Sequence, residues 1–404
     1  MPWKETRAVD EKMVLVAEFL KGTWTISELC RSFGISRKTG YKWIERYKSG
    51  GPGALSERSR APHRCPHSLS DESAQMILAA RKEHPTWGPR KILAWISRKN
   101  PRMQLPAAST AGDLLKRYGL TQPRRRRRRT SRFGQPLQTC LRPNDTWCAD
   151  FKGHFRMGDG RKCYPLTVSD AYSRFLLACR GLLDPNTEET KKRFEIAFKE
   201  FGLPHAIRSD NGSPFATIGP QGLSKLSIWW LKLGIRHERI QPGRPDQNGS
   251  HERMHRTLKQ ETAKPPKAAL QAQQHAFDRF RDEYNFERPH EALDQSPPAS
   301  WYRCSPRQYP QILPEFSYPR NATRRTVHES GRIRWKGQLI HIGAALGGEE
   351  IGLGESSDGI WEVWFGPLKL GLIDDGKLGL GLIEWPWPAT GYQQVFSLPS
   401  SSPH

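Results

Sequence analysis

The chain has 404 residues, and its 64 lysines and arginines against 41 aspartates and glutamates give a formal net charge of +23. A chain of this length is expected to form about two to four domains with cores of their own. Its composition, 36% hydrophobic and 26% charged residues, excludes a fully disordered chain. The sequence has neither an apolar run of about 18 residues nor the apolar stretch of a signal peptide near its start. We therefore expect a cytoplasmic, nucleoid-associated protein with no membrane partner.

The seven cysteines include no C-x-x-C pair, so neither a zinc ribbon nor a redox pair is indicated. They are expected to be reduced and to serve mainly as small core residues. The surplus of positive charge favours a polyanionic partner, and nucleic acid is the leading candidate. The alternative is a basic surface that is merely solvated.

Residues 1–50 predict a helix-turn-helix DNA-binding domain. A helix over 26–33 is followed by a turn at Gly34 and by another helix that Ser36 is placed to cap. Gly40 disfavours that second helix, because glycine costs about 1 kcal/mol inside a helix. The side chains expected to meet DNA at its N-terminal end are Arg37, Lys38, Thr39 and Lys42. The alternative is an ordinary helical hairpin.

Residues 65–122 predict a second helical module of the same type, although its signal is weaker. Ser109 and Thr110 are placed to cap its third helix. A basic arm or linker follows over 123–142. It contains six consecutive arginines, Arg124, Arg125, Arg126, Arg127, Arg128 and Arg129. Like charges this dense stay unfolded until they meet a polyanion, so we expect the arm to follow a phosphate backbone. No other feature supports the alternative, a nuclear-localisation signal.

Residues 143–305 predict an α/β catalytic core. Short apolar runs separated by Gly, Asp and Ser turns indicate strands, and a change to helical spacing over 187–201 indicates a helix. The predicted order is three strands, helix, strand, helix, strand, helix, which is the order of an RNase H-like sheet. From 320 to 385 apolar residues alternate with polar ones, which favours a small antiparallel barrel. The predicted fold is thus multidomain: all-α helix-turn-helix modules, an α/β RNase H-like core and a small all-β barrel.

Three acidic residues of this core are candidates for a metal site. Asp150 lies inside an apolar strand, where a lone carboxylate is costly to bury. Asp210 ends the fourth predicted strand, and Glu252 lies in the first turns of the last helix. In the predicted sheet the first and fourth strands are neighbours and the last helix crosses both, so the three carboxylates should converge. Converging carboxylates repel one another unless a hard cation such as Mg²⁺ binds among them.

Three motifs carry a family resemblance. They are Trp147-Cys-Ala-Asp150, Ser209-Asp-Asn-Gly212, and the run from Pro245 to Leu258, PDQNGSHERMHRTL. Together they resemble the retroviral-integrase-like DDE transposases of bacterial insertion sequences. The resemblance covers roughly residues 10–305 and includes the later run YNFERPHEAL at 284–293. Each motif alone would be weak, but three in this order on the expected elements are highly specific.

The resemblance implies a transposase that cleaves DNA at the ends of its element and joins the freed 3′-OH to target DNA. It implies that Asp150, Asp210 and Glu252 are catalytic and hold two Mg²⁺ ions, for which Mn²⁺ can substitute. Beside the metals, the side chains placed to contact DNA are Asn248, Arg253 and Arg256. For each arginine the alternative is an exposed helix position without a partner. The implied partners are the terminal inverted repeats, target DNA and further copies of the chain, in a homodimer or a higher oligomer.

The sequence departs from the retroviral pattern in two ways. Asp210 and Glu252 are separated by 41 residues (211 to 251), a longer interval than in retroviral integrases, so an insertion near 214–224 is expected. The spacing from Asp210 to Asp246 is closer to that of retroviral integrases, so Asp246 is a rival third acid. Its sequence context, however, predicts a loop. The zinc-binding His/His/Cys/Cys domain is also missing, and the helical modules occupy its place. Asp170, in a recurrent turn of the family, is expected to be structural.

Two other functions remain as alternatives. The run His251-Glu252-Arg253-Met254-His255 matches the H-E-x-x-H signature of zinc metalloproteases, with Glu252 as the general base. The neighbouring cations Arg253 and Arg256 disfavour a metal there, and the stretch reads as polar on nearly every side. The other alternative is an inactive DNA-binding regulator, which the presence of all three acids disfavours.

Overall fold

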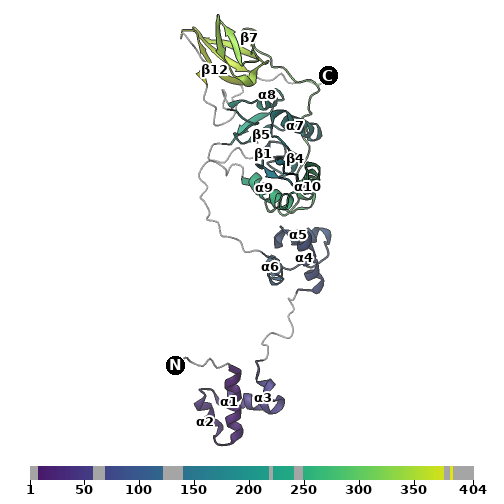
Figure 1. The fold of residues 1–404 in the computed structure, drawn as a ribbon, viewed down its shortest axis with the longest axis vertical. Coiled ribbons are helices and arrows are strands. Elements are labelled where there is room, and N and C mark those ends of the chain that lie inside the picture. Colours follow the sequence, from purple (N-terminus) through teal and green to yellow (C-terminus); the bar gives the residue numbers. More distant parts are fainter. Residues whose placement is uncertain are drawn as a thin grey trace. The chain divides into compact units, whose positions relative to one another are not determined.

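The computed structural model describes residues 8–57, 69–121, 140–217, 222–240, 249–376 and 383–384. The chain divides into two compact units, Met1–Leu69 and Ser70–His404, and each is described by itself (Figure 1). Among the described residues, no helix has both the length and the apolar character needed to cross a membrane.

The first unit is a bundle of short helices: α1 (Ala8–Lys21), α2 (Ile26–Ser32), α3 (Arg37–Gly50) and a 3₁₀ turn, η1 (Pro52–Leu55). As predicted, Ser36 caps α3, because its hydroxyl accepts a hydrogen bond of 3.2 Å from the Thr39 N–H. The core residues are Leu15, Val16, Leu29, Trp43 and Leu55. The order of helices and the buried Trp43 agree with a helix-turn-helix unit.

Gly40 has a role in this unit that its helix propensity does not indicate. It is buried on α3 where that helix packs on α2. A Cβ at this position would overlap the Sγ of Cys30, which is itself buried on α2. The glycine therefore permits the close approach of the two helices, and this gain offsets its cost inside a helix.

The second unit begins with three helices, α4 (Asp71–Glu83), α5 (Pro89–Lys99) and α6 (Ala108–Arg117). Trp87, Ile77 and Ile92 are completely buried among them. The prediction that Ser109 and Thr110 cap the third helix is wrong, because α6 begins at Ala108 and its N-cap is Ala107. Both hydroxyl residues therefore lie inside its first turn.

The central sheet contains β1 (Thr146–Phe151), β2 (Phe155–Arg156), β3 (Lys162–Asp170), β4 (Leu176–Leu182), β5 (Ala206–Ser209) and β6 (Arg236–Arg239). Its main order is β4-β3-β1-β5-β6, with the short β2 also paired to β3. The pairs β4–β3 and β3–β1 are antiparallel, whereas β1–β5 and β5–β6 are parallel. The predicted RNase H-like order of strands and helices is confirmed, and β1 lies at the centre beside β5.

Helices cover both faces of this sheet: α7 (Thr187–Phe201), α8 (Lys225–Lys232), α9 (Gly249–Thr262) and α10 (Leu270–Asp282). One apolar cluster joins Phe194 of α7 and Trp230 of α8 to Trp147 of the sheet. Another joins Met254 of α9 and Phe277 of α10 to the sheet. A π-helical turn (Glu283–Glu287) and two 3₁₀ turns (Glu291–Leu293 and Pro298–Ser300) follow α10.

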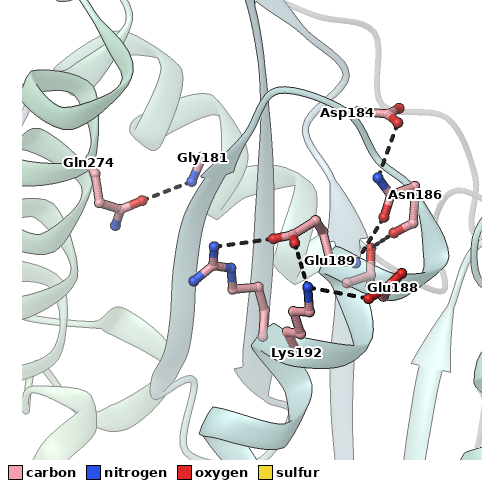
Figure 2. Close-up of polar contacts among 9 residues, drawn as sticks. Gly181, Asp184, Asn186, Glu188, Glu189, Lys192 and Gln274 are labelled. Carbon is pink, nitrogen blue, oxygen red and sulfur yellow. Dashed lines mark hydrogen bonds and ion pairs between the residues drawn. The ribbon is translucent and has the colours of Figure 1, made fainter.

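Polar contacts cap α7 and tie α10 to the sheet (Figure 2). Asn186 caps α7 by accepting from the Glu189 N–H at 2.8 Å, and Glu189 pairs with Lys192 at 3.1 Å. On the α10 side, the Gly181 N–H of β4 donates to Gln274 at 2.9 Å. These contacts fix where each helix begins or lies against β4, and none of them involves the candidate acids.

The C-terminal part is all-β, with β7 (Thr323–Thr326), β8 (Arg332–Trp335), β9 (Gln338–His341), β10 (Glu350–Ser357), β11 (Ile360–Phe365), β12 (Leu368–Asp374) and β13 (Ile383–Glu384). A 3₁₀ turn, Ala344–Leu346, connects β9 to β10. The five-stranded sheet has the order β13-β12-β11-β10-β7, and β8 and β9 form a separate two-stranded sheet.

The prediction of a closed barrel is therefore corrected. Within the described residues the two sheets remain separate and enclose one shared core, which includes Ile333, Ile340, Ile351 and Val363. Leu231 of α8 joins the same core. An alternating pattern shows that one face of each strand is buried, but burial between two sheets satisfies it as well as barrel closure does.

Candidate active site

Asp150 and Asp210 come from neighbouring parallel strands. Trp147 of β1 lies opposite Ile207 of β5 and Cys148 lies opposite Arg208, so the two strands run in register with a constant offset. Continued by two residues, this register sets Asp150 level with Asp210, which directly follows β5. Both carboxylates are therefore delivered to the carboxyl end of the parallel strand pair.

The electrostatics of Asp150 link it to the other two acids. Its pKa is raised to about 7, first by burial and then by the negative charge of Asp210, with a smaller contribution from Glu252. The Lys152 ammonium opposes this rise. Burial also raises the pKa of Asp210, although the Gly212 N–H donates to its carboxylate at 3.2 Å and partly offsets the effect. The carboxylates of Asp210 and Glu252 therefore lie close enough to disfavour the charged form of Asp150.

Glu252 reaches this region from the first turn of α9, and it is exposed. The buried residues of α9 are His251, Met254, His255, Leu258 and Thr262, which recur at helical spacing. The interpretation of this stretch as polar on nearly every side is therefore wrong. The two histidines supply part of the face that packs on the sheet, and Glu252 is left on the open side.

Thr167 holds the backbone of Asp150. The two residues lie opposite each other in the β1–β3 ladder, and the Thr167 hydroxyl donates to the Asp150 carbonyl oxygen at 3.2 Å. The same hydroxyl lies 2.7 Å from Nε2 of His251 and 2.6 Å from Nε2 of His255. The other ring nitrogen of His251, Nδ1, lies 3.0 Å from the hydroxyl of Ser169. Burial keeps both imidazoles neutral, and it lowers the pKa of His251 to about 3.

A similar arrangement lies behind Asp210. The Ser209 hydroxyl donates to the Asp210 carbonyl oxygen at 3.0 Å and lies 2.8 Å from Nε2 of the buried His237. Asn211 donates to the carbonyl of Ile240 at 2.7 Å, which ties the turn after β5 to the end of β6. A hydroxyl backed by a neutral histidine therefore fixes the carbonyl of each aspartate.

Sequence reasoning did not identify Thr167, Ser209 or His237 as part of the site. Thr167 reads as an ordinary strand residue, and Ser209 belongs to a family motif in which it is given no role of its own. The role of both hydroxyls depends on partners distant in the sequence, which no local motif specifies. Asp170 accepts hydrogen bonds from the Asn144 N–H, the Ser173 N–H and the Ser173 hydroxyl, and it is completely buried. This geometry supports the structural role expected for it.

The donor atoms present can hold a divalent cation. The carboxylates of Asp150, Asp210 and Glu252 offer the oxygen ligands that Mg²⁺ and Mn²⁺ take. Within the described residues, one group of potential ligand atoms, from Asp150, His251 and His255, lies within 4.8 Å of one another. The Nε2 atoms of both histidines contact Thr167, so these atoms do not form the open zinc site that the H-E-x-x-H signature requires.

The candidate DNA contacts are distributed over both units. Arg37, Lys38 and Lys42 are exposed on α3, and Thr39 is half-buried beside its cap. Arg253 and Arg256 are exposed on α9. The predicted site residues that lie outside the described part of the chain are Arg124, Arg125, Arg126, Arg127, Arg128, Arg129 and Asn248, together with the rival acid Asp246.

Family comparisons agree with this architecture. The description "Integrase core domain" applies to two family models, which match residues 141–245 and 233–298. A helix-turn-helix domain model matches 11–63 and a homeodomain-like domain model matches 39–115. The strand order and these matches define the second unit as one built around an integrase core.

A further set of matches is to proteins of insertion sequences. Residues 322–377 match the C-terminal domain of IS481 family transposases. The chain is 29% identical over 181 residues to the "Insertion element IS476 uncharacterized 39.2 kDa protein" of Xanthomonas euvesicatoria, covering 44% of this chain and 50% of that protein. It is 27% identical over 239 residues to the "Insertion element IS407 uncharacterized 31.7 kDa protein" of Burkholderia multivorans, covering 56% and 80%. The chain is thus similar to the transposases of insertion sequences.

Retroviral proteins match over a shorter stretch. The chain is 36% identical over 131 residues to the Gag-Pol polyprotein of baboon endogenous virus, covering 30% of this chain and 7% of that protein. The chain thus spans half of the IS476 protein and under a tenth of this polyprotein.

Among solved structures, the HTLV-2 integrase catalytic core with magnesium is similar at 16% identity and a TM-score of 0.32, covering 40% of this chain and 99% of that one. A simian T-cell lymphotropic virus intasome in complex with PP2A regulatory subunit B56 gamma is similar at 15% identity and a TM-score of 0.37, covering 70% and 91%.

Proposed function

We propose that this protein is an active transposase that cleaves DNA at the ends of its insertion sequence and transfers the freed 3′-OH to target DNA. The observation that carries the proposal is the site itself. Asp150 and Asp210 stand level on adjacent parallel strands, and Glu252 adds a third carboxylate from α9 that acts on the pKa of Asp150. Asp150, Asp210 and Glu252 are the proposed catalytic residues and metal ligands.

The proposed cofactor is a pair of Mg²⁺ ions, for which Mn²⁺ can substitute. When bound, such ions activate the attacking oxygen and stabilise the leaving oxygen of a phosphoryl displacement. The protein's own contribution is to hold the ligands in place. Thr167 and Ser209 fix the carbonyls of the two aspartates, and the buried neutral histidines behind them add no positive charge that would repel a cation.

The other parts of the chain are proposed to bind DNA. Residues 1–50 and 65–122 would recognise the terminal inverted repeats, and the arm at 123–142 would follow the phosphate backbone. Asn248, Arg253 and Arg256 would contact DNA beside the metals, because α9 also carries Glu252. Two DNA ends have to be joined, so we propose that the chain acts as a homodimer or higher oligomer on DNA, in the cytoplasm and associated with the nucleoid.

The test is a cleavage and strand-transfer assay with the full-length protein, Mg²⁺ and DNA that flanks its own gene. Asp150→Asn, Asp210→Asn and Glu252→Gln should each abolish cleavage and leave DNA binding intact. The matched control is Glu195→Gln, which removes a half-buried carboxylate that pairs with Lys199 on α7.

The outcomes separate the alternatives. Cleavage that survives Glu252→Gln would remove this residue from the triad and make Asp246 the third acid. Tight binding without cleavage by the wild type would identify a DNA-binding regulator, and zinc-dependent peptide hydrolysis would identify a protease.

A further inference from the structure

His255 presents one ring nitrogen to the Asp150 carboxylate. Its Nδ1 lies 3.7 Å from Oδ2 of Asp150, and the His255 side chain is only 2% exposed. This separation is too long for a hydrogen bond. Among the described residues no hydrogen bond reaches Nδ1, whereas Nε2 contacts Thr167 at 2.6 Å.

The hydroxyl of Thr167 determines which ring nitrogen carries the hydrogen. A threonine hydroxyl has one hydrogen and can accept two. Here the hydrogen is donated to the Asp150 carbonyl, which can only accept. Both histidines must then donate from Nε2, and each neutral ring is left with a lone pair on Nδ1.

The two lone pairs meet different surroundings. Nδ1 of His251 lies 3.0 Å from the Ser169 hydroxyl, which has a hydrogen to donate, so both nitrogens of this ring are satisfied. Nδ1 of His255 faces a carboxylate oxygen instead. A lone pair and an anionic oxygen repel each other unless positive charge lies between them. Nitrogen and oxygen ligands each lie about 2.1 Å from a metal ion, so one ion can bridge atoms that are 3.7 Å apart.

We propose that Nδ1 of His255 is a ligand, together with Oδ2 of Asp150, of one metal ion in the active site. This inference rests on the proposed function, because it takes Asp150 as a metal ligand. It adds an imidazole to an otherwise carboxylate site. Imidazole suits transition metals better than Mg²⁺, so the site should favour Mn²⁺, Co²⁺ or Zn²⁺ over Mg²⁺ in affinity. His251 is not a ligand.

The test measures Mn²⁺ bound to the full-length protein without DNA. Electron spin-echo envelope modulation detects ¹⁴N coupling when an imidazole nitrogen is a direct ligand of Mn²⁺. His255→Gln keeps an N–H donor that can reach Thr167 but removes the ring nitrogen that faces Asp150. His251→Gln is the matched control, and Asp150→Asn removes the oxygen ligand. Circular dichroism checks that each variant is folded.

We expect ¹⁴N modulation in the wild type and in His251→Gln, and its loss in His255→Gln and Asp150→Asn. The Kd for Mn²⁺ should rise by about tenfold or more in His255→Gln. Mn²⁺ binding that depends on Asp150 but shows no ¹⁴N modulation would overturn histidine ligation and leave the metal site of the transposase intact. Modulation that persists in His255→Gln would also overturn it. A wild type that shows the modulation but cleaves no DNA would support the ligand and contradict the proposed function.

Discussion

The hydroxyl oxygen of Ser209 lies 2.8 Å from Nε2 of His237. Because this hydroxyl gives its hydrogen to the carbonyl of Asp210, the imidazole must be the donor in the contact between them. His237 is completely enclosed, and burial, followed by the nearby charge of Arg239, lowers its pKa to about 3. A neutral imidazole therefore supports the turn that carries Asp210.

This relationship predicts a pH dependence of stability. The pKa of His237 is about 3 in the folded protein and 6.5 as its ordinary value. At a pH below 6.5, His237 is protonated in the unfolded chain but stays neutral in the folded protein. Protonation therefore favours the unfolded chain, and stability is lost as the pH falls from about 6.5 towards 3. Between pH 7 and pH 4.5 this histidine alone should remove about 2–3 kcal/mol from the free energy of unfolding.

Other buried histidines contribute in the same direction, so the measurement compares the wild type with His237→Gln. Urea unfolding at several pH values should show that the wild type loses stability faster than the variant as the pH falls. A difference in free energy of unfolding that stays constant from pH 7 to pH 4.5 would contradict the assigned titration of His237.

Thr167→Val should damage both stability and activity. The substitution keeps the shape of the side chain but leaves the buried Nε2 donors of His251 and His255 without their acceptor. An unsatisfied buried donor costs about 1–3 kcal/mol, so for the two donors we expect a loss of about 2–6 kcal/mol in urea unfolding. DNA cleavage should fall because the Asp150 carbonyl also loses its donor. Thr167→Ser keeps the hydroxyl and should therefore retain most of the stability and most of the cleavage activity. If the valine and serine variants lost equal stability and activity, the missing hydroxyl could not be the cause of the loss.

The sequence predicts the order of the core elements well, for a physical reason. The strands of the core are short apolar runs with turn residues between them, and α7 has a clear helical period. Asp150 stands out because it lies inside such a run, and Asp210 because it follows one. Which strands lie side by side could be inferred because the predicted order of strands and helices matches that of an RNase H-like sheet.

The errors come from partners that are distant in the sequence. His251 and His255 read as polar, yet Thr167 and Ser169 satisfy them inside the core. Gly40 reads as a weak point in a helix, because the contact that requires it comes from Cys30 on another helix. The same holds for the C-terminal sheets, where alternation fixes the buried face of each strand but not its neighbours.

Glu261→Ala should destabilise the second unit more than an exposed control. Glu261 accepts from Arg288 at 3.0 Å and from the hydroxyl of Thr86, which precedes α5, and the Arg288 side chain is only 8% exposed. Removing one member of a buried pair leaves the other charge without compensation, and we expect a loss of about 3 kcal/mol.

The control for this pair is Glu291→Ala. Glu291 pairs with Arg90 at 3.1 Å, but both side chains are more than 70% exposed, at 76% and 72%. Its removal should cost less than about 1 kcal/mol. Thermal unfolding of the two variants side by side provides the measurement. Equal losses would show that the Glu261 pair is screened by solvent like a surface pair.

Gly40→Ala should destabilise the first unit although alanine is the better helix former. The added methyl group would overlap the Sγ of Cys30, and such overpacking costs about 1–3 kcal/mol. Calorimetry of the full-length protein should show a lower transition temperature for this unit. Cys30→Ala should restore part of the loss in the double variant. Gly53→Ala is the control, because a Cβ there meets no atom within 4 Å. A Gly40→Ala protein as stable as the wild type would mean that α2 and α3 can separate without cost.

Arg37→Ala and Lys38→Ala test whether α3 meets DNA. Both side chains are exposed at the N-terminal end of the helix, next to the Ser36 cap. If each contacts a phosphate, its removal should reduce the slope of log K against log salt concentration by about 1. Lys21→Ala is the control, since Lys21 ends α1 and pairs with Glu18 at 2.6 Å. Binding of a terminal-repeat duplex is measured at several salt concentrations. Slopes that stay at the wild-type value in both α3 variants, while DNA is still bound, would place the phosphate contacts elsewhere in the chain, because a side chain that releases no counterions contributes nothing to the slope.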